Sequence, residues 1–446
     1  MQCISTRCIA KPKDMDSRLI TAFEAPLLDL EKKIIEATPA IERWFRLEWQ
    51  DYTPPFYFSA DLHNTGFKLA PVDSSLFPNG FNHLPAEMQP LAVQAAMAAI
   101  DRYCPDAKNI LLIPENNPQD DNYPQNLLHL IRLLQMAGLN LQLGHVGQAG
   151  DPPTEIALPD GTVLTAAPLL RIHANRRVGL PNYNPCAILL NNDLSKGPPE
   201  ILQDLHEQTL LPPLHSGSAI RKQSNHFSAY RDVARRFARA IDIDPWIISS
   251  LFRQLHAVDI ASKDGKEHLA RSVGQVLNRI LQKHKKYNID EKPFVTIRIE
   301  TMSGEPYLIH ASDAHEIADI TLAGPDDSPA AGEKARIADV FIQECVRSRE
   351  KMDEAVAEPT VYMIDRYVIG GFYRVFNRPS DIKTPNAQIS HFVPPAFSQP
   401  HAMPDKFVKP GTPSPNRFYM YGVIARLALL AAAIEMEKTD PELAEI

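Results

Sequence analysis

Short apolar runs alternate with helical patterns between residues 87 and 146, and this alternation constrains the fold more than any other feature. A helical pattern at Glu87–Tyr103 precedes the apolar run Asn109–Pro114, and a second helical pattern at Asn126–Ala137 precedes the run Leu139–Val146. Short apolar runs separated by helices are typical of the strands of a parallel sheet. We therefore predict a parallel or mixed sheet with helices on its faces.

The same periodicities predict more elements towards the middle of the chain. Two strands are expected, at Thr162–Arg171 and Cys186–Leu190. Helices are expected at Ser17–Trp49, Glu200–Leu210, Asn225–Ile241 and Lys266–Lys286, with Ser17 as the N-cap of the first.

The last third of the chain changes character. Alternating or β-branched runs predict strands at Pro293–Thr301, Tyr307–His310, Val340–Glu344, Thr360–Asp365 and Gly371–Phe376. An Ala- and Leu-rich helix is expected at Arg417–Lys438, and nine of the 39 prolines lie between Pro379 and Pro415, where an extended loop is expected. This part of the chain is predicted to be an α+β domain with a mainly antiparallel sheet.

Composition and charge exclude several classes of protein. A chain of 446 residues with 44% apolar content can hold two or three domains, and a net charge of -8 provides no basic field for nucleic acid. The longest apolar stretch, Tyr421–Ile434, is too short for a membrane span and carries Arg426. The N-terminus lacks the apolar core of a secretory signal, so a cytoplasmic protein is expected. Five scattered cysteines without CxxC spacing are expected to be reduced thiols.

The most informative segment runs from Glu358 to Val375. It has the pattern of two strands joined by Gly370 and Gly371, with charged side chains set among apolar neighbours. A charge inside a strand must be paired or bound, since an unpaired buried ion costs several kcal/mol. Two interpretations of Asp365 are therefore open, a structural ion pair with an arginine and a functional role. No Walker loop, GxGxxG, HExxH or GxSxG motif is present.

Several dispersed segments together resemble a bacterial form of glutamate-cysteine ligase. These segments are residues 358–375, 222–227, 244–246, 55–62, 66–73, 76–78, 80–82 and 421–433, and the similarity spans roughly residues 17–438 in collinear order. The resemblance implies an α/β, ATP-grasp-like fold with an N-terminal α/β lobe and a C-terminal α+β lobe. It also implies the ATP- and Mg²⁺-dependent joining of the side-chain carboxylate of L-glutamate to the amine of L-cysteine, which is the first step towards glutathione.

Under this resemblance the chain divides into four parts. They are an N-terminal tail (residues 1–16), an α/β substrate-binding domain (17–215), a helical segment of the ATP-grasp lobe (216–292), and a C-terminal ATP-grasp-like lobe (293–446) that includes the Pro-rich loop 379–415 and the closing helix. The partners implied are small-molecule substrates, with neither nucleic acid nor membrane. The sequence does not decide whether the chain forms a homo-oligomer.

Candidate site residues follow from the needs of phosphoryl transfer and amino-acid binding. Arg374 is expected to clamp phosphate, because a guanidinium grips two oxygens at once. Asp365 and Asn386 are expected to supply oxygen ligands to magnesium. Arg298 stands where the family carries a lysine, and the resemblance implies that Arg298 and Arg374 bind ATP and act in catalysis. Gln343 and Glu344 stand where ATP-grasp-like proteins present their hinge to adenine and ribose. The expected substrate-binding residues are Asp61, Asn64, Asn82, Lys222 and Asn225, and Asn225 is also interpreted as a helix N-cap.

Two departures from the family pattern leave alternatives open. The loop from Arg298 to Pro306 has a single glycine, Gly304, and places Glu305 where phosphates are expected, so like charges would meet. Lys383 replaces an acidic residue shortly before Asn386, and a cation cannot ligate magnesium. The alternatives are a catalytically weakened or non-catalytic paralogue that binds amino acids or a partner, and a ligase for another amine.

Overall fold

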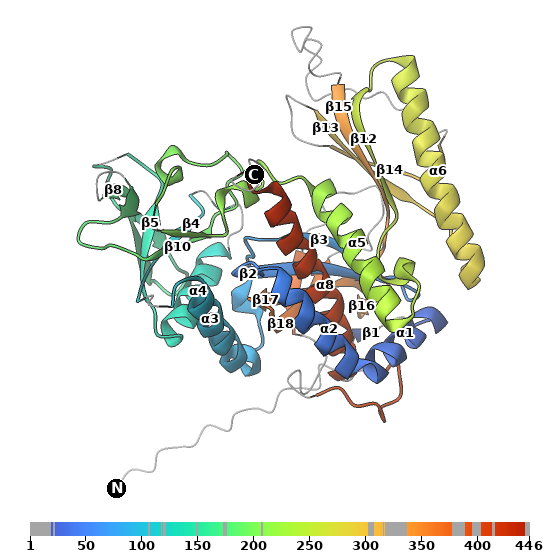
Figure 1. The fold of residues 1–446 in the computed structure, drawn as a ribbon, viewed down its shortest axis with the longest axis horizontal. Helices are drawn as coiled ribbons and strands as arrows, with labels where there is room; N and C mark the ends of the chain where they lie inside the picture. The colour runs from blue at the N-terminus through green and yellow to red at the C-terminus, as the bar shows by residue number, and fades with distance from the viewer. Residues whose placement is uncertain are drawn as a thin grey trace.

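Three sheets and their helices form the body of the protein in a computed structural model (Figure 1). The structure describes residues 19–20, 23–105, 108–116, 118, 122–148, 150–172, 176–206, 208–301, 307–314, 316, 337–376, 389–394, 403–412 and 415–441. Within these residues the sheets have seven, six and four strands, and a two-stranded ribbon lies beside the second.

The six-stranded sheet confirms the predicted parallel layer. Its order is β11-β10-β4-β5-β7-β6, and every pair except β6–β7 is parallel. The strands are β4 (Asn109–Pro114), β5 (Asn140–His145), β6 (Thr154–Ala157), β7 (Val163–Pro168), β10 (Ala187–Asn191) and β11 (Thr209–Leu211). Helices α3 (Gln89–Tyr103) and α4 (Tyr123–Met136) pack on the face that carries Ile110 and Leu112.

The other face of this sheet differs from the prediction of helices on both faces. Leu111 and Ile113 pack there against short strands and loops rather than against an α-helix. These strands are β8 (Leu170–Ile172) and β9 (Arg177–Gly179). The predicted helix Glu200–Leu210 is also wrong, because only a turn of 3-10 helix forms at Glu200–Leu202 before β11 begins.

The seven-stranded sheet joins the two ends of the chain. In this sheet β2 (Tyr57–Asn64) pairs with β17 (Ala355–Ile364) and with β3 (Leu69–Ser75). It continues through β18 (Tyr367–Phe376) to β19 (Ile389–Val393), and its other edge is β16 (Lys351–Met352) with β1 (Leu19–Ile20). Strand β19 lies within the segment that was expected to be an extended loop. The predicted boundary at residue 215 does not follow this sheet, since β2 and β3 belong with the C-terminal strands.

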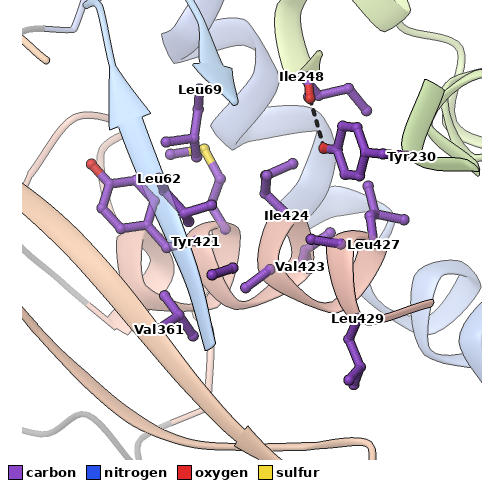
Figure 2. Close-up of a cluster of buried hydrophobic side chains, with 14 of the residues drawn as sticks. Leu62, Leu69, Tyr230, Ile248, Val361, Tyr421, Val423, Ile424, Leu427 and Leu429 are labelled. Carbon is purple, nitrogen blue, oxygen red and sulfur yellow. Dashed lines mark hydrogen bonds between the residues drawn. The ribbon is translucent and has the colours of Figure 1, made fainter. Parts of the chain in front are cut away.

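Helix α8 (Pro415–Thr439) forms the core beneath this sheet. It is apolar on all sides, as expected for a helix with no exposed face, and it packs against Leu62, Leu69 and Val361 (Figure 2). It is surrounded by α1 (Ala25–Glu36), α2 (Thr38–Asp51) and α5 (Gln223–Ile241). Within the described residues it is the one helix long and apolar enough to cross a membrane, but 89% of its apolar window is buried inside the protein.

Helices α1 and α2 replace the single helix that was predicted from Ser17 to Trp49. The break lies at Ala37, because Pro39 has no backbone N–H to donate to the carbonyl oxygen of Ile35 and its ring fits the first turn of a new helix. Ser17 itself lies outside the described residues.

The four-stranded sheet is antiparallel, with the order β12-β15-β13-β14. Its strands are β12 (Phe252–Asp259), β13 (Val295–Thr301), β14 (Tyr307–Ala311) and β15 (Ile337–Glu344). Helix α6 (Lys263–Tyr287) covers the outer face (Figure 1). Ile297 and Ile299 pack there against Val273 and Val276. Strand β12 lies inside the part of the chain, residues 216–292, that was predicted to be helical.

Candidate active site

Six polar or charged side chains gather on the face of the seven-stranded sheet that points away from α8. They are Asp61, His63, Asp73, Glu358, Thr360 and Arg374. Asp61 lies opposite both Asp73 and Thr360, and Glu358 lies opposite Arg374. Residues directly opposite in a sheet project from the same face, so four strands bring these groups together. We call this set the sheet-face cluster.

Arg374 is the cation of the sheet-face cluster. Its Nη2 lies 2.8 Å from Asp61 Oδ2 and 3.6 Å from Glu358 Oε2. Although burial disfavours the charged form, these two carboxylates raise the pKa of Arg374 above its ordinary value. The Nε of Arg374 is buried and has no partner among the described residues. The guanidinium is therefore charged and fixed in place, and 24% of the side chain stays exposed.

His63 connects the sheet-face cluster to the loop that follows β15. Its Nε2 lies 3.1 Å from Glu358 Oε1, and its Nδ1 lies 2.6 Å from the carbonyl oxygen of Val346. Burial opposes the charge, but the Glu358 carboxylate raises the pKa of His63, and His63 together with Arg374 lowers the pKa of Glu358 against the effect of burial. The face of the seven-stranded sheet thus meets the four-stranded sheet at this histidine.

Arg298 and Gln343 project from the face of the four-stranded sheet opposite α6, because the alternating residues Ile297 and Ile299 point towards that helix. Arg298 Nε donates to Glu300 Oε1 at 2.8 Å, and Gln343 Nε2 donates to Ser250 Oγ at 3.0 Å. Within the described residues, neither forms a hydrogen bond or ion pair with the sheet-face cluster. Their predicted roles towards ATP stay predictions, and residues 302–306 of the loop after β13 lie outside the described residues.

Glu344 differs from the free hinge acid that was expected. Its carboxylate is buried and accepts hydrogen bonds from Lys68 Nζ at 2.7 Å, Trp246 Nε1 at 3.1 Å and the backbone N–H of Leu251 at 2.8 Å. A pocket of about 460 Å³ beside it is lined by residues of the β2–β3 loop, α6 and the segment 344–349. Because three protein donors already occupy the carboxylate, the geometry favours a structural role for Glu344.

The predicted substrate residues are dispersed. Asn64 is fully buried, donates to Tyr421 Oη and accepts from the backbone N–H of Gly66. Asn82 is half-buried next to His83. The ring of His83 stacks on Phe392, and Phe392 lies opposite Arg374 in the sheet. Asp61 therefore belongs to the sheet-face cluster and Asn82 lies beside it, whereas the side chain of Asn64 supports a turn.

Lys222 and Asn225 lie at the start of α5. Lys222 occupies the N-cap position, and its Nζ lies 3.1 Å from Asp339 on β15. The interpretation of Asn225 as the N-cap is wrong, because Asn225 is the third residue inside the helix and its side chain is exposed.

The predicted magnesium ligands have different outcomes. Asp365 is fully buried in the turn between β17 and β18, with its oxygens 3.1 and 3.3 Å from Arg102 Nε and Nη2. Asp365 therefore forms the structural ion pair that the sequence analysis set against a functional role. Because it lies at the opposite end of the hairpin from Arg374, the geometry does not support metal binding by Asp365. Asn386 lies outside the described residues.

Comparison with known proteins identifies the family of this chain. The family model described as glutamate-cysteine ligase matches residues 31–436. The chain belongs to the glutamate-cysteine ligase family. A crystal structure of a protein described as a gamma-glutamylcysteine synthetase from Methylobacillus flagellatus KT is 42% identical, with a TM-score of 0.85 over 95% of this chain and 99% of that chain.

A second solved structure is a glutathione synthetase-like effector from Globodera pallida, which is 9% identical with a TM-score of 0.33 over 84% of this chain and 85% of that chain. No curated protein matches the sequence significantly.

In this member of the glutamate-cysteine ligase family, sequence reasoning found Arg374 and Asp61 but assigned them to separate tasks. It gave no role to Glu358, Asp73 or His63. A usable signal was present, because Ser59, Asp61 and His63 alternate with the apolar residues Phe58, Ala60 and Leu62. Such alternation predicts one polar and one buried face of a strand.

Proposed function

We propose that this chain joins the side-chain carboxylate of L-glutamate to the amine of L-cysteine at the expense of ATP. A carboxylate is a poor acceptor for an amine. One of its oxygens therefore first attacks the γ-phosphorus of ATP, which breaks the bond to ADP and forms an acyl-phosphate. The cysteine nitrogen then attacks the acyl carbon, phosphate leaves, and the nitrogen loses a proton. The product is γ-glutamylcysteine.

The observation that carries this proposal is the position of Arg374 in a chain of this family. A charged guanidinium whose side chain is 24% exposed can bind an oxygen of the transferring phosphoryl group and stabilise the charge that develops there. Asp61 and Glu358 hold the guanidinium in one orientation, which removes much of the entropic cost of positioning it.

Magnesium is expected with the nucleotide, and the donor set of the sheet-face cluster fits it. Asp61 and Asp73 lie opposite each other, and the surrounding protein and the charge of Asp61 raise the pKa of Asp73, a repulsion that a cation would relieve. Magnesium in phosphoryl-transfer sites takes one or two carboxylates, with phosphate and water as its other ligands. When bound, it would neutralise charge on the phosphate oxygens. No group of three or more His, Cys, Asp or Glu in the described residues is arranged to hold a metal by itself.

The direct test is phosphate release from Mg·ATP in the presence of L-glutamate and L-cysteine, with mass spectrometry of the product. Release that depends on both amino acids and yields γ-glutamylcysteine would support the proposal. Release that is no faster than in buffer at millimolar substrate would reject it. A panel of other amines in place of cysteine measures how strongly the enzyme selects its nucleophile.

A further inference from the structure

A cavity of about 810 Å³ opens where the strand order of the six-stranded sheet reverses. From β4 the chain proceeds through β5 and β7 on one side, then returns to β10 and β11 on the other side of β4. The cavity is lined by residues that follow the carboxyl ends of β4 and β10, among them Glu115 and Asp193. In open α/β sheets, ligands bind in the crevice at this reversal point.

Hydrogen bonds hold the polar wall of the cavity in place. The hydroxyl of Tyr123 accepts from the backbone N–H of Glu115 at 2.8 Å and donates to the carbonyl oxygen of Asn191 at 2.9 Å. The backbone N–H of Asp193 donates to Glu115 Oε1 at 2.7 Å, and Ser218 Oγ donates to Asp193 Oδ2 at 3.1 Å. The loops after β4 and β10 are thereby tied to each other.

The wall carries negative charge without a cationic partner. In the part of the chain that the structure describes, no Lys, Arg or His lies within ion-pair distance of Glu115 or Asp193, although the exposed Lys196 also lines the cavity. Burial and the nearby Asp193 carboxylate raise the pKa of Glu115. A cationic ligand group would remove this electrostatic penalty.

The cavity begins close to the sheet-face cluster. Ser75 lines the cavity and lies two residues beyond Asp73 on β3, so both side chains are on the same face and their Cα atoms are about 7 Å apart. Asn79 also lines the cavity, and its carbonyl oxygen accepts a hydrogen bond from Tyr362, two residues beyond Thr360 on β17.

We propose that this cavity binds the α-ammonium group of L-glutamate at Glu115 and Asp193, with the side-chain carboxylate extended towards Arg374. This inference rests on the proposed function. L-Cysteine fits less well, because its amine must leave any anchoring carboxylate to attack the acyl carbon. The α-ammonium of glutamate does not react, and it lies about 5 Å from the side-chain carboxyl carbon in an extended conformation.

The test is calorimetric binding to the full chain without ATP. Glutarate is glutamate without its amino group, so the unmodified protein should bind L-glutamate at least tenfold more tightly than glutarate. Glu115→Gln keeps the size of the side chain and an acceptor for the Asp193 N–H but removes the charge. It should weaken L-glutamate at least tenfold and leave glutarate within twofold, as expected for loss of a charged hydrogen bond. Glu155→Gln, at an exposed position on β6, is the matched control and should change neither.

Three outcomes would overturn the inference. The unmodified protein could bind both ligands equally, it could bind no L-glutamate at millimolar concentration, or Glu115→Gln could weaken both ligands to the same extent. The proposed function fails separately. Selective, Glu115-dependent binding without ligation would preserve the inference and reject the ligase, whereas ligation by Glu115→Gln with an unchanged KM for L-glutamate would reject the inference alone.

Discussion

Lys68 and Glu344 are 276 residues apart in the sequence and form a buried ion pair, with 2.7 Å between Nζ and Oε1. Lys68 belongs to the loop between β2 and β3, and Glu344 ends β15, so the pair joins the seven-stranded sheet to the four-stranded sheet. Burial lowers the pKa of Lys68 to about 8, even though Glu344 opposes that shift. This contact between the two sheets therefore contains a lysine charge that is costly to bury and that depends on Glu344 for its stabilisation.

Lys68→Met should lower the free energy of unfolding by about 3–5 kcal/mol, because Glu344 would be left buried without its cation. The double variant Lys68→Met/Glu344→Gln should recover most of that loss, since the neutral amide keeps an acceptor for Trp246 and the Leu251 N–H. Guanidinium unfolding of the single and double variants measures both effects. A loss below about 1 kcal/mol in the single variant would show that the pair is not a structural joint.

Arg374→Ala should reduce turnover roughly a hundredfold or more, since one charge-stabilising donor is lost from the phosphoryl-transfer site. Arg239→Ala, on the exposed face of α5, is a control that removes an arginine away from the sheet-face cluster. Initial rates of phosphate release, with melting temperatures to monitor folding, provide the measurement. A reduction of less than tenfold would remove Arg374 from the catalytic residues.

Asp365→Asn should leave the magnesium dependence of turnover unchanged, because Asp365 pairs with Arg102 and does not face the sheet-face cluster. Asparagine tolerates the left-handed backbone at this position, where φ is 49°. Arg102→Ala should instead destabilise the fold by about 2–4 kcal/mol, because among the described residues the fully buried carboxylate would keep a single cation, Arg366 at 3.8 Å. A higher magnesium requirement in Asp365→Asn would restore this residue as a metal ligand.

Glu350 should make stability depend on pH. It is fully buried and accepts a hydrogen bond from Tyr421 at 2.7 Å; burial raises its pKa from 4.5 to about 7, although Tyr421 and Arg417 oppose the shift. Between pH 4.5 and about pH 7 the Glu350 carboxyl group is ionised in the unfolded chain but still protonated in the folded protein. The contribution of Glu350 to the free energy of unfolding therefore falls as the pH rises from about 4.5 to about 7.

Glu350→Gln removes this titration. Relative to the unmodified protein, the variant should gain on the order of 2–3 kcal/mol between about pH 5 and about pH 8. Urea unfolding of both proteins at the two pH values tests this expectation, and an equal difference at both values would contradict it.

Many elements of secondary structure could be predicted from periodicity alone. Helices α3, α5 and α6 and strand β4 were expected within a few residues of their observed bounds, because each has a regular apolar pattern over its whole length. Helix α8 was expected from its Ala- and Leu-rich composition instead. The failures arose where the pattern was weak or interrupted. Residues 200–210 contain turn-forming and polar residues among the apolar ones, and the first helix is broken at Ala37.

The amino-acid sequence by itself was sufficient to predict the kind of chemistry in this chain. It indicated charged residues within strands, an arginine proposed to bind phosphate, and resemblance to a ligase family. The partner of each charge was decided only in three dimensions. Asp61 lies beside Arg374 and Asp365 beside Arg102 because β2 pairs with β17 and α3 packs under the hairpin. Such pairing depends on strand register and helix packing between distant segments, and no local pattern encodes either.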